Sequence, residues 1–237
     1  MPESPLCISL ITPTYNEREN VSHLADEVFS VIREYPDIDL ELIVVDDNSP
    51  DGTGAIAEAL SDRYPVKVVH RQGKMGLGSA VMEGFSRSKR ACLGVIDADL
   101  SHDPLVLPQL IFGLRDYDLV IGSRYNPDSR VEKWPWYRKG LSQMGVFMAR
   151  QLTGVQDPLS GYFFLHRKVL NNLELTSNGY KILLEILVKG SYSKVSEVPF
   201  IFRNRQFSSS KLNLEEYILF LRQLVTFSFN KLRGKRF

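Results

Sequence analysis

The sequence contains only two cysteines among 237 residues, and both lie in apolar stretches typical of strands. Two thiols are too few for a disulfide framework or a cysteine-based zinc site, so we interpret Cys7 and Cys92 as buried and unreactive. Low-complexity tracts are also lacking, and the hydrophobic share of 43% and charged share of 24% exclude a disordered or collagen-like chain. A chain of this length buries a substantial core without covalent cross-links.

Long apolar runs are absent as well, since none reaches the ~18–20 residues that a membrane-spanning helix requires. The nearest stretch, residues 217–229, is interrupted by Arg222 and Gln223. Residues 1–5 lack the basic start of a secretory signal peptide. We therefore expect the protein to work in the cytoplasm.

The net charge of +1 is small but unevenly distributed. From Arg203 to the C-terminus, eight basic residues face two acidic ones, so this end carries +6 and the first 202 residues carry −5. The body has no basic cluster and no zinc-finger or RNA-recognition motif, which argues against a nucleic-acid partner. A basic end on an acidic body favours an anionic partner, such as a membrane surface or a phosphate.

Short apolar runs alternate with helical periodicity along the first half of the chain. The predicted strands are residues 6–12, 40–45, 66–69, 92–96 and 119–121. Helices are predicted from Asn16, as cap, to about residue 34, at residues 77–85, and after the Asp103–Pro104 pair. This order predicts an α/β, Rossmann-like fold in which helices flank a mainly parallel sheet and ligands bind at the carboxyl ends of its strands.

Two acidic residues follow the fourth predicted strand. Asp97 and Asp99 are two positions apart, so an extended backbone directs both carboxylates to one side. Mg²⁺ and Mn²⁺ prefer oxygen ligands and often join carboxylates to substrate phosphates. The same spacing is common in loops where one aspartate caps a turn and the other is exposed. The spacing alone therefore does not establish a metal site, and the neighbouring residues must support it.

The first two predicted strands also end in polar residues. Asp46 has oxygens that suit a base or a ribose, although turn formation explains this segment equally well. Tyr15 offers a flat stacking face and Glu17 an acceptor, and both also suit loop packing and helix capping. Residues 73–78 are rich in glycine but match neither the dinucleotide-binding pattern nor the P-loop.

Basic side chains occur in several later segments. The candidates are Arg124, Arg138, Lys139, Arg203, Arg205 and Lys211. Arginine binds phosphate through two parallel hydrogen bonds, and lysine binds it as a point charge. Each residue alone is a typical solvated surface residue. Together with the acidic strand ends, they indicate an anionic acceptor facing a metal-held phosphate.

These motifs together resemble the dolichyl-phosphate mannose synthases, inverting glycosyltransferases with the GT-A fold. The resemblance covers nearly the whole chain and is carried by residues 13–20, 45–53, 97–102, 122–125, 131–139, 157–162, 179–183 and 197–200. The first three stretches occur broadly among processive and lipid-linked transferases. The Trp-Pro-x-x-Arg-Lys and Asp-Pro-x-Ser-Gly segments narrow the resemblance to transferases with polyprenyl-phosphate acceptors.

The resemblance implies a nucleotide-sugar site built from distant segments. The residues that would hold the nucleoside are Pro13, Tyr15, Glu17 and Asp46. The residues that would neutralise or cover the donor diphosphate are Lys181, Arg203 and Lys211. The loop from residue 205 to residue 211 would close over this diphosphate.

The resemblance also implies a divalent cation, Mg²⁺ or Mn²⁺, beside the donor sugar at Asp97 and Asp99. The family usually adds a glutamine ligand two residues later, where this chain has Ser101. A hydroxyl is a weaker ligand, so metal preference or affinity would differ. Arg124 and Arg138 would hold the acceptor phosphate and, with Asp99, are the predicted catalytic residues.

The implied reaction transfers mannose from GDP-mannose to dolichyl or another polyprenyl phosphate in one inverting displacement. The acceptor phosphate is already anionic near neutral pH, since its second pKa is about 6, so no strong general base is needed. One alternative is a UDP-sugar enzyme that makes polyprenyl-phosphate glucose or a similar product. Another is a non-catalytic nucleotide-sugar-binding protein, which the joint presence of aspartates and basic residues disfavours.

We expect a catalytic domain at residues 1–212 and an amphipathic, basic helix at residues 213–237. This helix and the segment 137–153 each have an apolar face that suits either the membrane interface or packing against the sheet. The expected location is peripheral, at the cytoplasmic face of a membrane. Without a spanning helix, the chain would be a soluble form, a part of a longer protein, or an enzyme that relies on a partner membrane subunit.

Overall fold

The computed structural model describes residues 4–125, 130–131, 136–173, 175, 181–203, 220 and 222–228, and only the backbone of residues 130–131 and 136–144. Its main feature is a seven-stranded sheet with the strand order β3-β2-β1-β4-β7-β5-β8. The strands are β1 (Leu6–Thr14), β2 (Ile38–Asp46), β3 (Val66–His70), β4 (Cys92–Val95), β5 (Leu119–Ser123), β7 (Phe163–His166) and β8 (Val195–Pro199). The five strands predicted from apolar runs are therefore confirmed.

The pairing of the strands confirms a mainly parallel sheet. β1, β2, β3 and β4 pair in parallel, and β8 pairs in parallel with β5. β7 runs antiparallel to both of its neighbours, β4 and β5. A separate two-stranded pair joins β6 (Arg130–Val131) to β9 (Ile201–Phe202).

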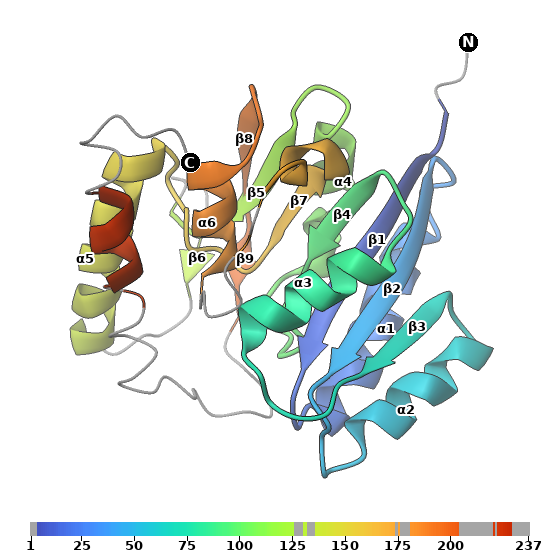
Figure 1. Cartoon of the computed structure of the whole chain (residues 1–237). Helices are drawn as coiled ribbons and strands as arrows, with labels where there is room; N and C mark the ends of the chain where they lie inside the picture. The colour runs from blue at the N-terminus through green and yellow to red at the C-terminus, as the bar shows by residue number, and fades with distance from the viewer. Residues whose placement is uncertain are drawn as a thin grey trace.

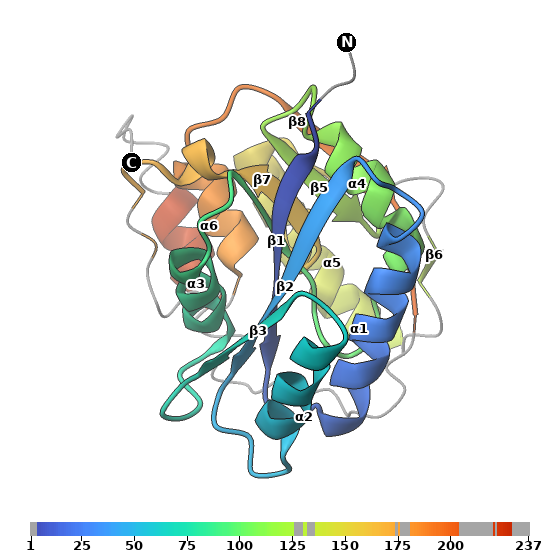
Figure 2. The same cartoon turned by 90° about the vertical axis from the view of Figure 1, so that its right-hand side faces the viewer.

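Helices cover both faces of the sheet (Figures 1 and 2). One face carries α1 (Arg18–Ile32), α2 (Thr53–Ala59) and α4 (Leu107–Gly113), and the other carries α3 (Leu77–Arg87) and α6 (Ile182–Lys189). Because strand side chains alternate between faces, Leu10 and Leu42 enter the first core while Ile11 and Ile43 enter the second. Short 3₁₀ turns occur at Leu60–Asp62 (η1), Pro104–Val106 (η2) and Arg167–Leu170 (η3).

A third apolar cluster joins α5 (Trp136–Thr153), α6 and the helical residues 222–228. Phe220, Leu224 and Phe227 are buried there, whereas Val225 is 51% exposed. Gly145 of α5 permits this approach, since a Cβ at that position would lie 2.7 Å from the Phe220 ring. The rest of the helix predicted at residues 213–237 lies outside the described residues. Within the described part of the chain, no helix is long and apolar enough to cross a membrane.

Two local predictions of helix caps have clear outcomes. Asp103 caps η2 by accepting from the N–H of Leu105 at 3.1 Å, as predicted. The prediction for Asn16 was wrong, because α1 begins at Arg18 and the backbone of Asn16 is left-handed, with φ of 56°. The N–H of Asn16 instead donates to the hydroxyl of Ser49 in the loop after β2.

The two cysteines differ in their surroundings. Cys92 is buried as predicted, and burial raises the pKa of its thiol to about 11, which keeps it protonated and unreactive. Cys7 is exposed, contrary to prediction. The reason is its place near the start of β1, before the pairing with β4 begins at Ile8.

Glu41 of β2 anchors a buried polar cluster and provides a test of stability against pH. It accepts from Ser9 at 2.6 Å and pairs with Lys67 at 2.7 Å and Arg90 at 3.5 Å. Burial alone would raise the pKa of this carboxyl, but the bonds from Lys67 and Ser9 and the charge of Arg90 lower it below its usual 4.5. The charged form therefore stabilises the fold above about pH 4.5, and this contribution is lost as the pH falls through the lowered pKa.

We expect Glu41→Gln to lower the free energy of unfolding by about 1–3 kcal/mol at neutral pH, because a buried charge-assisted bond is lost. The deficit should shrink at an acid pH below the lowered pKa, where the parent carboxyl is also neutral. Urea unfolding at both pH values measures it, with the exposed Glu34→Gln as a control expected to change stability by under about 0.5 kcal/mol. An equal deficit at both pH values would contradict the electrostatic account.

Candidate active site

The polar strand ends predicted from the sequence meet at one edge of the sheet. β1 lies between β2 and β4, and parallel pairing places Thr14 opposite Asp46. The N–H of Ile96 bonds to the carbonyl of Ile11, so the loop that carries Asp97 leaves the sheet at the same edge. The acidic segments after β2 and β4 therefore flank the end of β1.

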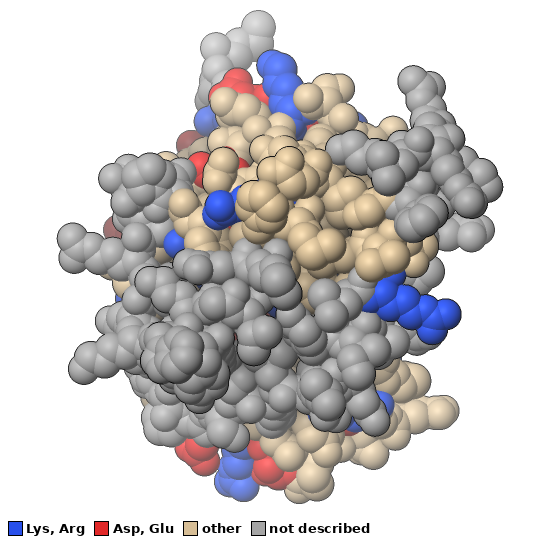
Figure 3. Space-filling view, turned by 90° about the vertical axis from the view of Figure 1, so that its left-hand side faces the viewer, with Lys and Arg blue, Asp and Glu red and all other residues tan. Residues whose placement is uncertain are grey.

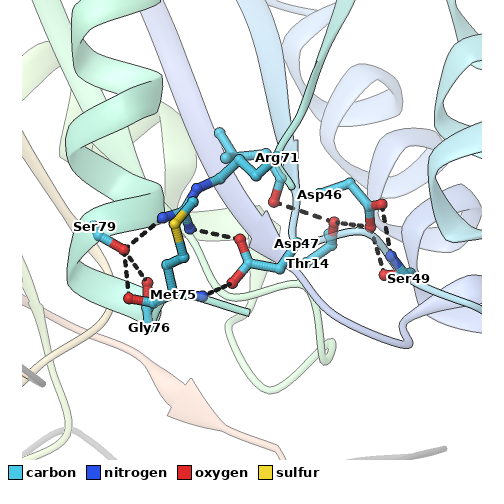
Figure 4. Close-up of polar contacts among 9 residues, drawn as sticks. Thr14, Asp46, Asp47, Ser49, Arg71, Met75, Gly76 and Ser79 are labelled. Carbon is cyan, nitrogen blue, oxygen red and sulfur yellow. Dashed lines mark hydrogen bonds and ion pairs between the residues drawn. The ribbon is translucent and has the colours of Figure 1, made fainter. Parts of the chain in front are cut away.

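Asp46 ties together the loops that follow β1 and β2 (Figure 4). Its carboxylate accepts from the hydroxyl of Thr14 at 3.1 Å, and from the hydroxyl and N–H of Ser49 at 2.5 and 3.0 Å. Pro13 precedes Thr14 in β1. These bonds fix the shape of both loops beside the edge, and the contacts of Pro13 and Asp46 with a nucleoside stay predictions.

A buried ion pair beside this carboxylate was missed by the sequence analysis. Nη1 of Arg71 lies 2.5 Å from Oδ1 of Asp47, and only 6% and 7% of these side chains are exposed. The N–H of Met75 donates to Asp47 at 3.3 Å, and Nη2 of Arg71 donates to the hydroxyl of Ser79 at 2.6 Å. Burial raises the pKa of the Asp47 carboxyl, and Arg71 offsets only part of this rise. The pair fastens the glycine-rich segment before α3 to the end of β2.

Tyr15 and Glu17 lie in the loop between β1 and α1. Nζ of Lys74 is 5.3 Å from the centre of the Tyr15 ring, so the glycine-rich segment reaches this loop. The Glu17 carboxylate accepts from the side-chain amide of Asn20 at 2.6 Å, and its backbone N–H donates to Thr53 at 3.0 Å. The predicted nucleoside residues thus lie at the ends of β1 and β2 and in the loop after β1.

The loop after β4 holds the two predicted metal ligands in different surroundings. The Asp97 side chain is 29% exposed, whereas Asp99 is buried. The hydroxyl and N–H of Ser101 donate to Oδ1 of Asp99 at 2.5 and 3.1 Å. Gly161 leaves space for the side chain of Asp97, because a Cβ at position 161 would lie 2.8 Å from Oδ2 of Asp97.

The donor atoms of this loop fit a hard divalent cation. The described residues contain no group of three or more His, Cys, Asp and Glu side chains suited to a metal. Mg²⁺ is usually bound by one or two carboxylates together with substrate phosphates, so Asp97 and Asp99 suffice when a diphosphate supplies further oxygens. Ser101, the predicted third ligand, is fully buried and its hydroxyl proton is engaged by Asp99.

Arg124, a predicted phosphate contact, lies directly after β5 and is bound by Asp157. Asp157 is fully buried and accepts from Nε and Nη2 of Arg124 at 2.8 Å each, and from its N–H at 2.9 Å. Burial would raise the pKa of Asp157, but the facing guanidinium outweighs burial and lowers it. The N–H groups of Gln156 and Asp157 donate to Glu197 of β8, each at 2.8 Å. This bonding fixes the orientation of the guanidinium.

Arg203 follows β9 and contacts the loop that carries the aspartates. Its N–H donates to the carbonyl of Ser101 at 2.9 Å, and Nη2 lies 3.1 Å from Asp103. Nη1 lies 3.7 Å from Glu27 of α1. Lys181 precedes α6, and its positive charge helps to lower the pKa of Asp157. Two of the predicted diphosphate residues thus lie close to the residues that hold the aspartates and Arg124.

Four of the predicted basic residues have no described side chain. Arg138 and Lys139 lie in the first turns of α5, where only the backbone is described. Arg205 and Lys211 lie outside the described residues, as does the loop between them. Their contacts with phosphate stay predictions.

Comparison with known proteins assigns the chain that carries this site to a family. The family model described as Glycosyl transferase family 2 matches residues 9–174, more than half of the chain. The chain belongs to glycosyl transferase family 2. The match includes the loops after β1, β2, β4 and β5, which are the segments that carry most of the predicted site.

Curated relatives of this glycosyltransferase agree with the resemblance found in its motifs. A dolichol-phosphate mannosyltransferase of Pyrococcus furiosus is 43% identical over 222 residues, which cover 92% of this chain and 62% of that protein. A dolichol-phosphate mannosyltransferase of Saccharomyces cerevisiae is 38% identical, with 91% and 85% covered. A polyprenol monophosphomannose synthase of Mycolicibacterium smegmatis is 38% identical, with 86% and 80% covered.

Solved structures confirm the fold. A mannosyltransferase from Pyrobaculum calidifontis, in complex with GDP-Man and Mn²⁺, has a TM-score of 0.66 at 18% identity, with 99% of this chain and 66% of that chain covered. A glucosyl-3-phosphoglycerate synthase from Mycobacterium tuberculosis, in complex with Mn²⁺ and UDP, also has a TM-score of 0.66, at 21% identity, with 95% and 79% covered. At these identities the likeness supports the GT-A-like architecture and no particular donor.

Proposed function

We propose that this chain transfers mannose from GDP-mannose to dolichyl or another polyprenyl phosphate, with inversion at the anomeric carbon. The observation that carries the proposal is the agreement of three relatives, 38–43% identical over at least 86% of the chain, whose names specify mannose transfer to dolichol phosphate or formation of a polyprenol monophosphomannose. The arrangement of the sheet edge supports it, because two aspartates and several basic residues converge there.

The proposed reaction is a single displacement. An oxygen of the acceptor phosphate bonds to the anomeric carbon of mannose while the bond from that carbon to the diphosphate oxygen breaks, and GDP leaves with the electron pair. Asp97 and Asp99 would hold Mg²⁺ or Mn²⁺, which when bound neutralises charge on the leaving diphosphate. The acceptor needs no strong base, since its second pKa is about 6.

The chain's own residues align the two anions. We assign Arg124 and Arg138 to the acceptor phosphate, and Lys181, Arg203 and Lys211 to the donor diphosphate. Asp157 holds the Arg124 guanidinium through Nε and Nη2, so this group is oriented before the acceptor arrives. Such preorganised charge lowers the barrier because no reordering is needed during the reaction.

An assay with detergent-dispersed polyprenyl phosphate tests the proposal. GDP-mannose, UDP-glucose and UDP-N-acetylglucosamine are each supplied with Mg²⁺, Mn²⁺ or EDTA, and labelled lipid is extracted. We expect mannosyl lipid from GDP-mannose alone, lost with EDTA and restored by excess Mn²⁺ or Mg²⁺. Product from a UDP-sugar alone would be consistent with the same mechanism but would show that the donor is a UDP-sugar. No product with any donor would favour a non-catalytic nucleotide-sugar-binding protein.

We further propose that the face formed by residues 145–153 of α5 together with residues 220 and 222–228 rests on the membrane that holds the acceptor. Phe147 of α5 is 61% exposed and Val225 is 51% exposed, although Phe220, Leu224 and Phe227 beside them are buried. The coloured atoms of this side of the molecule are mostly uncharged, with isolated basic and acidic side chains among them (Figure 3). Exposed apolar groups with nearby basic residues suit an anionic lipid interface.

Replacing Phe147 and Val225 by serine tests the membrane face without removing the buried residues of the same helices. We expect binding to vesicles that contain anionic lipid to weaken by about tenfold or more, since burial of one large apolar side chain contributes ~1.5–3 kcal/mol. Vesicle co-sedimentation measures it. Leu105→Ser on η2, 69% exposed, is the matched control and should leave binding unchanged. Equal binding of the double variant and the parent would contradict this face.

A further inference from the structure

Ser101 and His102, which come shortly after the two aspartates, each contact one of them. Ser101 is fully buried and His102 only 2% exposed, so neither is a surface residue of this loop. Ser101 contacts the side chain of Asp99, and His102 contacts the backbone of Asp97. Both residues also contact the segment around β9, which enters the site from the other end of the chain.

Ser101 controls the orientation of the Asp99 carboxylate. Its hydroxyl and its N–H both donate to Oδ1, at 2.5 and 3.1 Å, which fixes the rotation of the carboxylate. The intervening Leu100 has a φ of 60°, so the backbone turns tightly to make both bonds. The carbonyl of Ser101 accepts from the N–H of Arg203 at 2.9 Å, which anchors the turn to β9. Because the Ser101 hydroxyl donates its proton to Asp99, it acts on the site through the Asp99 carboxylate.

His102 controls the backbone at Asp97. The N–H of Asp97 donates to Nδ1 of His102 at 3.3 Å, so Nδ1 carries the lone pair and the proton lies on Nε2. The ring is held by three aromatic side chains, with centroids at 5.0 Å from Tyr162, 5.5 Å from Phe200 and 5.8 Å from Phe202. Tyr162 follows Gly161, the residue that leaves space for the Asp97 carboxylate.

We propose that Ser101 and His102 are positioning residues that set the Asp97 and Asp99 carboxylates for a divalent cation, and that Ser101 does so through Asp99 rather than as a metal ligand. This inference rests on the proposed function. It assigns to Ser101 a role that differs from that of the glutamine usual at this position in the family. It also explains why a smaller residue fits here, because the turn leaves Ser101 fully enclosed.

Substitutions of Ser101 separate the two roles. Ser101→Ala should weaken Mn²⁺ binding in the presence of GDP by about tenfold, the lower end of the effect seen when partners of metal ligands are removed. Titration followed by the electron paramagnetic resonance signal of free Mn²⁺ measures it. Ser101→Cys, loaded with Cd²⁺, should give no thiolate-to-metal charge-transfer band beyond that of the parent, which has Cys7 and Cys92. A new band, or unchanged Mn²⁺ affinity in Ser101→Ala, would overturn the role assigned to Ser101.

Two substitutions of His102 isolate the bond to Asp97 from packing. His102→Phe keeps an aromatic ring in the cluster but removes the acceptor, and should weaken Mn²⁺ binding by about tenfold or more. His102→Asn places an oxygen near the position of Nδ1 and should recover most of the affinity. His166→Phe, which removes a histidine bond to the carbonyl of Leu114 at 2.7 Å, is a control for stability. Its thermal midpoint should fall while its Mn²⁺ affinity is unchanged.

The outcomes distinguish this inference from the proposed function. If the parent binds Mn²⁺ with GDP and His102→Phe binds it equally well, the positioning role of His102 is wrong and the proposed function stands. Equal weakening by His102→Phe and His102→Asn, with both variants folded by circular dichroism, would show that packing and not the acceptor matters. If the parent neither binds Mn²⁺ with GDP nor forms mannosyl lipid, the proposed function itself fails.

Discussion

Replacing Asp157 by alanine is expected to lower the free energy of unfolding by about 3–5 kcal/mol, because it leaves the Arg124 guanidinium buried without its partner. The Arg124 side chain is only 13% exposed, and Asp157 accepts three of its hydrogen bonds. A loss of this size is a large share of the ~5–15 kcal/mol that stabilises a typical domain. Urea unfolding at neutral pH measures it.

Two further variants test the cause of this loss. Asp157→Ala combined with Arg124→Met removes both charges, and should recover part of the stability, because no unpaired charge stays buried. Asp26→Ala breaks an exposed pair with Arg63, whose side chains are 45% and 59% exposed, and should cost under about 1 kcal/mol. A double variant no more stable than Asp157→Ala would show that the loss comes from the loop and not from the charge on Arg124.

The α/β architecture could be predicted because apolar runs and helical periodicity are local signals. The antiparallel β7 could not be predicted, since Phe163, Phe164 and Leu165 are fully buried and their apolar run carries no sign of direction. The cap at Asp103 was predicted because its signal lies in adjacent residues. The cap at Asn16 was wrong because Ser49, from the next loop, binds the backbone of Asn16. Tertiary contacts override local preference at such positions.

The place of the strand-end aspartates in the candidate site could be predicted, because it follows from the fold. The ion pair of Asp47 with Arg71 was missed because it depends on β3 lying beside β2. The only sign of this ion pair in the sequence was an arginine directly after a predicted strand. Arg124 also directly follows a strand, so this sign does not single out Arg71. The partner of Arg124 is Asp157, 33 residues later, and only the pairing of β5 with β7 brings them together. Ion pairs between distant segments can be predicted only when the order of the strands in the sheet is known.

Asp99→Asn is expected to lower kcat for mannosyl transfer by about 10³-fold, equivalent to ~4 kcal/mol of transition-state stabilisation. The reason is that a neutral amide binds a divalent cation poorly, and the developing charge on GDP then lacks its counter-charge. Asparagine keeps an oxygen that can accept from Ser101, so the turn at Leu100 is retained. Initial rates with GDP-mannose and polyprenyl phosphate measure the loss.

The control for Asp99→Asn is Asp62→Asn, an exposed aspartate in η1 that should keep the parent rate. Stabilisation of each variant by GDP in thermal unfolding separates loss of chemistry from loss of fold. An enzyme that depends on Asp99 should lose turnover while it stays folded. Full activity of Asp99→Asn would contradict the metal role of this carboxylate. The charge of the diphosphate would then have to be neutralised by the basic residues at the same edge, such as Arg203.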